Sequence, residues 1–258
     1  MTSITERGAE LRRLHDAPEL LQVVNVWDAI SAKAVAALPE TRALATASHS
    51  IAATLGYEDG ENIPLDLMID MVGRIVATTD LPVSADLEGG YGDPGETIRR
   101  AIGVGAVGAN LEDQVRPFEE AVAHVRAAVV AADAEGVPFA LNARTDVWLR
   151  NTYPTAAEKT AEAIRRGRAF LDEGATCVFV PGRLDEETVT QLVAGLGVRK
   201  LSVIAVPGSL PPARLHELGV ARVSYGPWTQ RVALAAVQRT AAELYAGGEL
   251  PRDVPTLN

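Results

Sequence analysis

Short apolar runs alternate along the chain with longer segments whose apolar residues recur at helical spacing. The runs are short and mostly apolar, which is typical of strands buried on both faces. We expect strands at Leu21–Val26, Ala43–Ala47, Val83–Asp86, Val107–Leu111, Phe139–Asn142, Cys177–Val180, Ser202–Ala205 and Arg222–Ser224. The helical patterns cover Ile4–Leu14, Ala29–Ala37, Leu65–Thr78, Glu96–Gly103, Phe118–Ala134, Ala156–Glu173, Glu186–Leu196, Pro211–Leu218 and Trp228–Tyr245.

This alternation over 258 residues predicts an α/β protein, a (β/α)8 TIM-type barrel. No Gly-, Ser- or Pro-rich linker interrupts the series, so we expect one domain spanning residues 1–258. The alternative is an open doubly wound sheet, since Gly103–Gly108 reads GVGAVG. That dinucleotide fingerprint must follow a strand, whereas this run precedes one. It therefore indicates a helix end that turns into the fourth strand.

Composition narrows the classes of partner. The chain carries 24 basic and 34 acidic residues, a formal charge of −10, which argues against a nucleic-acid partner. Its single cysteine, Cys177, cannot form an internal disulfide, which is typical of a reducing cytosol. No apolar stretch has the length of a signal peptide or a membrane span. We expect a soluble, cytoplasmic protein with no membrane partner.

The third predicted strand ends in two carboxylates. In PVSADLEGGYGD, Asp86 and Glu88 are two residues apart and face the same side, before a glycine-rich loop. Paired acids beside a tight loop suit a hard cation such as Mg²⁺, although an isolated D-x-E is also compatible with a solvated acidic turn. The active sites of barrels lie at the carboxyl ends of the strands. Glu112 ends the fourth strand and Arg144 follows the fifth, so charged groups gather at neighbouring strand ends and favour a functional site.

These strand ends resemble the isocitrate lyase/phosphoenolpyruvate mutase superfamily. The resemblance is carried, in order along the chain, by VVNVWDAISAKAV, TASHSIAATLGYEDG, PVSADLEGGYG, GANLEDQ, NARTD and ARVSYGP. It implies that Asp86 binds Mg²⁺, or alternatively Mn²⁺, most directly. It also implies that Glu88, Glu112 and Asp59 hold metal-bound waters or reach the metal through them.

The same resemblance implies a substrate site for a small anionic carboxylate. Arg144 holds a carboxylate or the group being transferred. The backbone N–H groups of Ser48 and His49, beside Ala47, receive the other carboxylate. Trp27 ends the first strand and either lines this site or packs in the core.

The chain departs from the lyase branch after the fourth strand. That branch carries a loop whose cysteine acts as general acid/base, whereas here Gln114 is followed by Val115-Arg116-Pro117 and the next helix. Two residues are candidates to replace the cysteine: Arg116, which is otherwise a solvated loop charge, and His49, which is otherwise a buried structural histidine.

Other polar residues have structural interpretations. His15, His124 and His216 fall on helical stretches and are expected at the surface. Asp113 and Asp146 are expected to orient loops rather than touch substrate.

The resemblance implies a Mg²⁺-dependent enzyme that cleaves a C–C bond in an oxaloacetate- or malate-like acid through an enolate. A divalent ion and fixed N–H groups can stabilise that developing oxyanion. Without the loop cysteine, a standard isocitrate or methylisocitrate lyase is not expected. The alternatives are phosphonopyruvate-type C–P chemistry, a metabolite-binding barrel without turnover, and a metal-dependent aldolase that runs in the synthetic direction.

The last helix has an apolar face of Val232, Leu234, Val237 and Leu244. This face either packs on its own barrel or, as the resemblance implies, is exchanged between subunits of a homodimer or homotetramer.

Overall fold

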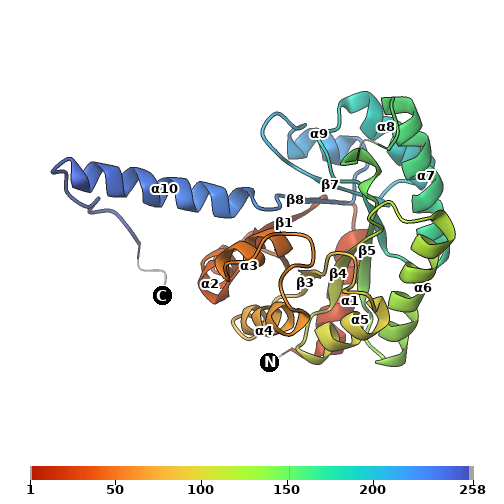
Figure 1. Ribbon diagram of the computed structural model, residues 1–258, viewed down its shortest axis with the longest axis horizontal. Coiled ribbons are helices and arrows are strands. Elements are labelled where there is room, and N and C mark those ends of the chain that lie inside the picture. Colours follow the sequence, from red (N-terminus) through yellow and green to blue (C-terminus); the bar gives the residue numbers. More distant parts are fainter. Residues whose placement is uncertain (1, 151, 256–258) are drawn as a thin grey trace.

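The computed structural model describes residues 2–150 and 152–255, which form a closed barrel of parallel strands in the order β1 to β8 (Figure 1). The strands are β1 (Leu21–Val26), β2 (Leu44–Thr46), β3 (Val83–Asp86), β4 (Gly108–Glu112), β5 (Ala140–Arg144), β6 (Cys177–Phe179), β7 (Leu201–Ile204) and β8 (Arg222–Ser224). Each pairs in parallel with its neighbours, and β8 closes the barrel against β1. The predicted TIM-type barrel is confirmed.

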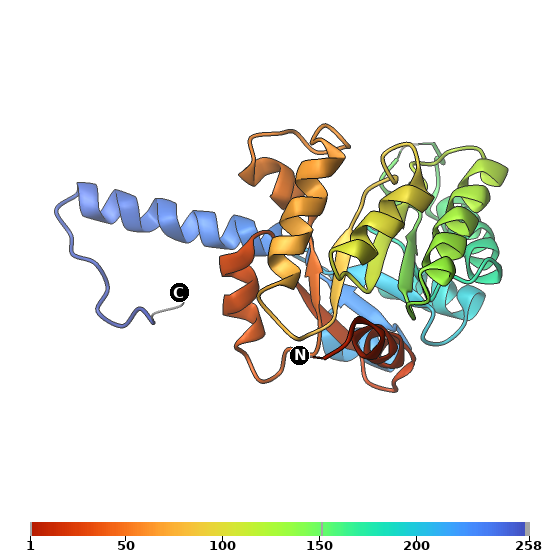
Figure 2. The ribbon, with the colours of Figure 1, turned by 90° about the horizontal axis from the view of Figure 1, so that it is seen from below.

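The helices pack around the barrel, except for the last one, which extends away from it (Figure 2). They are α1 (Ile4–Asp16), α2 (Ala29–Ala36), α3 (Ser48–Thr54), α4 (Leu65–Val76), α5 (Pro94–Gly103), α6 (Phe118–Ala134), α7 (Ala156–Asp172), α8 (Glu186–Leu196), α9 (Pro212–Glu217) and α10 (Trp228–Tyr245), with a short 3₁₀ helix η1 (Asp146–Trp148). Helix α5 ends at Gly103 and β4 begins at Gly108, so GVGAVG is the predicted helix-to-strand turn.

Helices α3 and η1 were not predicted from the sequence. Helix α3 has only seven residues and follows β2 directly, and its N-cap residue Ala47 makes no side-chain capping bond. A helix that short carries too few apolar repeats to be separated from a strand end. Its placement matters, because it fixes Ser48 and His49 at the mouth of the barrel.

Helix α1 closes the end of the barrel opposite to the loops that carry the acids. A Cβ built on Gly108 would lie 2.7 Å from Leu11 Cδ2, so the helix sits directly against the start of β4. This position buries His15, which is 1% exposed. The expectation that His15 lies at the surface is wrong, because the helix that carries it plugs the barrel base.

Helix α10 extends away from the barrel (Figure 1). The side chains of Val232 and Val237 are 66% and 65% exposed, so this apolar face does not pack on its own barrel. Exchange of the helix between subunits stays a prediction. Within the described residues, no helix is both long and apolar enough to span a bilayer.

Candidate active site

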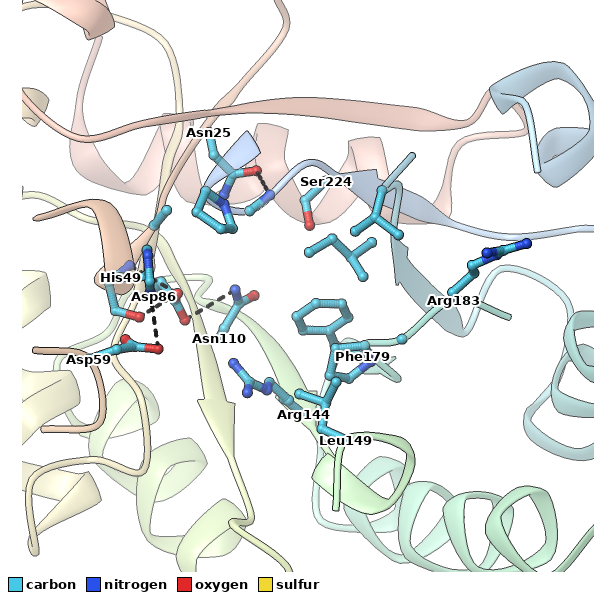
Figure 3. A pocket seen from close by; sticks show the side chains of 18 residues that line it. Asn25, His49, Asp59, Asp86, Asn110, Arg144, Leu149, Phe179, Arg183 and Ser224 are labelled. Carbon is cyan, nitrogen blue, oxygen red and sulfur yellow. Dashed lines mark hydrogen bonds and ion pairs between the residues drawn. The ribbon is translucent and has the colours of Figure 1, made fainter. Parts of the chain in front are cut away.

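A cavity of about 360 Å³ opens at the carboxyl ends of the strands (Figure 3). A second recess of about 290 Å³ adjoins it and shares Ser48, Asp59 and Arg144. The predicted site residues, except Arg116 and Trp27, divide between the two spaces. The larger cavity is lined by Ala47, Ser48, His49, Asp59, Asp86 and Arg144, and the recess adds Glu88 and Glu112. The barrel therefore brings together residues that are almost a hundred positions apart in the sequence.

Asp86 is held in a fixed orientation at the end of β3. Its Oδ2 accepts hydrogen bonds from the backbone N–H of Ser48 (3.0 Å) and from the Ser48 hydroxyl (2.8 Å). Its Oδ1 faces the Asn110 side-chain amide at 3.4 Å. Because α3 begins at Ser48, this N–H points at Asp86. We expected from the sequence that the Ser48 N–H would bind a substrate carboxylate. In the structure it orients Asp86 instead.

Glu88 is buried beneath the glycine loop, with 3% of its surface exposed. Its carboxylate accepts a hydrogen bond from the Tyr91 hydroxyl (3.2 Å) and another from the backbone N–H of Glu61. Burial, followed by the nearby charge of Asp86, raises the pKa of Glu88 to about 7. The loop turns tightly at Gly90, which has a φ of 90°, and a Cβ there would lie 2.9 Å from Pro94 Cα.

Arg144 lies between two carboxylates. Its Nη1 is 2.8 Å from Glu112 Oε2, and its Nε donates to Asp146 Oδ1 at 2.7 Å. The pairing follows from the sheet register, which places Glu112 beside Arg144 on β4 and β5. Burial raises the pKa of Glu112, although the Arg144 charge opposes this. Burial also acts to lower the pKa of Arg144, but its two acidic partners outweigh that effect and raise it.

Asp113 braces the loops after β4 and β5, as expected from the sequence. Its carboxylate accepts hydrogen bonds from the Thr145 hydroxyl (2.8 Å), from the N–H groups of Val115 (2.9 Å) and Asp146 (3.0 Å), and from the Arg166 guanidinium (3.0 Å). Arg166 comes from α7, where the sequence shows only one more charged helix position. Sequence reasoning missed this buried arginine, because its partner is 53 residues away.

Two predicted residues lie elsewhere. As far as the described residues define the two spaces, Arg116 lines neither; its Nε is 3.4 Å from Glu120, and its guanidinium lies beside Gly89. Trp27 lines an apolar groove between α2 and α10, together with Trp228. The structure therefore gives Arg116 and Trp27 no contact with the cavity.

His49 lies at the cavity wall, partly exposed. Its Nδ1 is 3.5 Å from Asp59 Oδ2. A histidine beside a carboxylate and open to the cavity can exchange a proton with a bound ligand. It is not a buried structural histidine, since its side chain is 42% exposed.

Sequence reasoning missed two polar residues on the barrel wall. Asn25 accepts hydrogen bonds from the N–H groups of Tyr225 (2.7 Å) and Gly226 (2.8 Å), which fixes the end of β8. Asn110 orients Asp86, and its own Oδ1 accepts a hydrogen bond from Asn142 at 2.8 Å. Asn25 and Asn110 could have been identified from the sequence, because each is an asparagine inside a mainly apolar strand.

The acidic residues suit a hard divalent cation. Across the described part of the chain, no three His, Cys, Asp or Glu side chains converge on one point. Mg²⁺, however, is usually bound by one or two carboxylates and completes its shell with water. Burial raises the pKa values of Glu88 and Glu112, and neighbouring carboxylates add a smaller rise, so their negative charge is costly without a cation nearby. The oxygen-only residues Asp86, Glu88 and Glu112 therefore fit Mg²⁺, which would neutralise that charge.

Comparisons with known proteins identify the family of the chain. The sequence profile of the phosphoenolpyruvate phosphomutase family matches residues 11–245. An uncharacterized protein of Mycobacterium tuberculosis is 32% identical over 233 residues, which cover 90% of this chain and 87% of that protein.

Solved structures are similar over nearly the whole chain. A Burkholderia cenocepacia protein described as a candidate phosphonomutase has a TM-score of 0.86 at 40% identity, covering 95% of this chain and 100% of that one. Oxaloacetate acetylhydrolase in complex with its product oxalate has a TM-score of 0.86 at 26% identity, covering 97% and 91% of the two chains. The chain belongs to the phosphoenolpyruvate phosphomutase family, and so to the isocitrate lyase/phosphoenolpyruvate mutase superfamily.

Proposed function

We propose that this protein is a Mg²⁺-dependent enzyme that cleaves a C–C bond in a small α-oxo or α-hydroxy carboxylate. The substrate is of the oxaloacetate or malate type, and the bond breaks with formation of an enolate. The observation that carries this proposal is the group of acids at the ends of β3 and β4, Asp86, Glu88 and Glu112, which lines two adjoining spaces together with Arg144. Family membership and the similarity to oxaloacetate acetylhydrolase support it.

Each group in the cavity has a task in this proposal. Asp86, held by Ser48 and Asn110, with Glu88 and Glu112 behind it, holds the cation. When bound, Mg²⁺ supplies Lewis-acid stabilisation of the negative charge that develops on oxygen. Arg144, fixed on both sides, orients a carboxylate of the substrate without moving during the reaction.

His49 is the proposed group that gains or loses a proton during bond cleavage. It takes this part because the connection between Gln114 and α6 is only three residues long and contains no cysteine. Asp59 lies beside its ring, with Oδ2 at 3.5 Å from His49 Nδ1. Without that cysteine, we do not propose the standard isocitrate or methylisocitrate reaction.

The test is a Mg²⁺-dependent assay on oxaloacetate, a set of malates and phosphonopyruvate. We expect turnover of a C4 or C5 di-acid that EDTA abolishes and that Asp86→Asn lowers by roughly 100-fold or more. Asp70→Asn is the matched control, because Asp70 is an exposed acid on α4 whose side chain contacts only Arg74 among the described ion pairs. Turnover that survives both EDTA and Asp86→Asn would refute the metal site.

A second candidate is a metabolite-binding barrel without turnover, which the short connection after Gln114 favours. It is distinguished by Mg²⁺-dependent binding of oxalate together with no turnover of any compound in the set. Turnover of phosphonopyruvate alone would instead assign C–P chemistry to the same site.

A further inference from the structure

Three loops meet at Glu88, which lines the smaller recess. They are the connection between α3 and α4, the glycine loop after β3 and the connection between β4 and α6, which cover residues 55–64, 87–93 and 113–117. The Glu61 carboxylate lies between them. Its Oε1 accepts a hydrogen bond from the backbone N–H of Tyr91 at 2.6 Å, and its Oε2 is 3.5 Å from the side-chain amide nitrogen of Gln114. One side chain therefore contacts both of the neighbouring loops.

Glu61 and the glycine loop hold each other through both main chain and side chain. The backbone N–H of Glu61 donates to Glu88 Oε2, and the Tyr91 hydroxyl donates to Glu88 Oε1 at 3.2 Å. Tyr91 in turn is held at its own backbone N–H by the Glu61 carboxylate. Both oxygens of the buried Glu88 are therefore oriented by groups whose positions depend on Glu61.

The backbone of these loops adopts conformations that few side chains favour. Six non-glycine residues of the described chain have a left-handed φ, between 49° and 64°, and five of them lie in the three loops: Glu61, Glu88, Tyr91, Gln114 and Val115. Such conformations cost free energy and persist where surrounding contacts hold them. The bond from the Tyr91 N–H to the Glu61 carboxylate is a contact of this kind, because it joins two of these left-handed residues.

The connection that carries Glu61 also carries Asp59, which lines both spaces (Figure 3). Residues 53–60 are exposed, whereas Glu61 is partly buried and Ile63 is fully buried. The connection is therefore anchored in its second half, directly after Asp59. Displacement of Glu61 would shift Asp59 and release Glu88 together.

We propose that Glu61 is a positioning residue for the cation site: its carboxylate joins the connection 55–64 to the glycine loop and thereby holds Glu88 and Asp59 in the arrangement that binds Mg²⁺. In the described part of the chain, the residues that line the two spaces do not include Glu61, so it acts through these neighbours and not by contact with the metal. The reach of the side chain to the Tyr91 N–H carries the effect, and its negative charge is not required. This inference rests on the proposed function, in which the acids at the ends of β3 and β4 hold the cation.

The experiment separates the reach of the Glu61 side chain from its charge. Glu61→Gln keeps an oxygen at the same distance from the backbone and removes the charge, whereas Glu61→Asp keeps the charge on a side chain one methylene shorter. Aspartate adopts the left-handed conformation more readily than most residues, so this variant is expected to fold. Glu61→Ala, which lacks the acceptor, is the second shortened variant. Glu58→Gln is the matched control, because Glu58 is an exposed acid of the same connection.

Mg²⁺ alone is titrated calorimetrically into the full chain of each protein, and urea unfolding without metal verifies that each one is folded. We expect Glu61→Asp and Glu61→Ala to bind Mg²⁺ roughly tenfold more weakly than the wild type, the factor that one hydrogen bond to a charged group is worth. Glu61→Gln and Glu58→Gln should bind it as the wild type does. A residue that only stabilised the fold would change urea unfolding and leave the Mg²⁺ affinity of the folded protein unaltered.

Two results overturn the positioning role of Glu61. One is wild-type Mg²⁺ affinity in either shortened variant, and the other is a loss in Glu61→Gln equal to that in Glu61→Asp. Absence of Mg²⁺ binding by the wild type instead overturns the proposed function on which the inference rests.

Discussion

Replacing His15 should remove a specific part of the pH dependence of stability. His15 lies at the closed base of the barrel and is 1% exposed. Its Nδ1 is 2.8 Å from the carbonyl oxygen of Leu11, so this nitrogen carries the proton of the neutral ring. Protonation would fall on Nε2, which has no hydrogen-bond partner among the described residues. Burial, and next the charge of Arg222, lower the pKa of His15 to about 4.

The direction in which His15 changes folding stability with pH follows from proton linkage. An unfolded histidine with a pKa near 6.5 binds a proton as the pH falls, while folded His15 stays neutral until about pH 4. The unfolded state therefore holds more protons between these values, and stability is lost as the pH falls through this window. The two pKa values give a loss of about 2 kcal/mol between pH 7 and pH 5. The charged groups that face the ring do not reverse this sign, since Arg222 and Lys200 lower the pKa and outweigh Asp16.

The measurement is urea unfolding of metal-free wild type and His15→Asn at pH 7 and pH 5, at one protein concentration. The asparagine amide nitrogen can occupy the place of Nδ1 and keep the bond to Leu11. The smaller side chain leaves a space whose cost does not depend on pH, so it cancels in the difference between the two pH values. The variant should lose less stability than the wild type on acidification, by about 2 kcal/mol. Equal losses in the two proteins would refute the burial argument.

Three other changes test the loops and the last helix. Gly90→Ala should lower the free energy of unfolding by about 2 kcal/mol and weaken Mg²⁺ binding, because the backbone has a φ of 90° there and the new Cβ collides with Pro94. Unchanged urea unfolding together with an unchanged calorimetric Mg²⁺ titration would contradict this. Asp113→Asn should lower the unfolding free energy by about 2 kcal/mol, since it removes a buried partner of Arg166 that also holds two loops; a variant as stable as wild type would show that the bracing is dispensable. Val237→Asp should shift the protein toward monomer in analytical ultracentrifugation if α10 docks on a second copy, and an unchanged mass would rule out this face as an interface.

The barrel could be predicted because most of the strands are short, mainly apolar runs followed by a helical pattern. Parallel strands buried on both faces require such runs, and the closed topology follows from eight repeats of one unit. Helix α3 could not be predicted, because seven residues after a strand give too little periodicity. His15 was wrongly predicted to lie at the surface, for a different reason. Helical spacing shows which residues share a face of α1, but it does not show that α1 crosses the base of the barrel.

The sequence by itself determined which chemical groups stand at the strand ends. The order of Asp86, Glu112 and Arg144 along the chain, combined with the rule that parallel strands expose their carboxyl ends together, was enough to predict one shared site. Only the tertiary structure decided how these groups are used. It turned the Ser48 N–H toward Asp86 and paired Arg144 with acids on both sides. Such pairings depend on distances between residues far apart in the chain, and those distances are set by barrel closure and loop packing rather than by any local pattern.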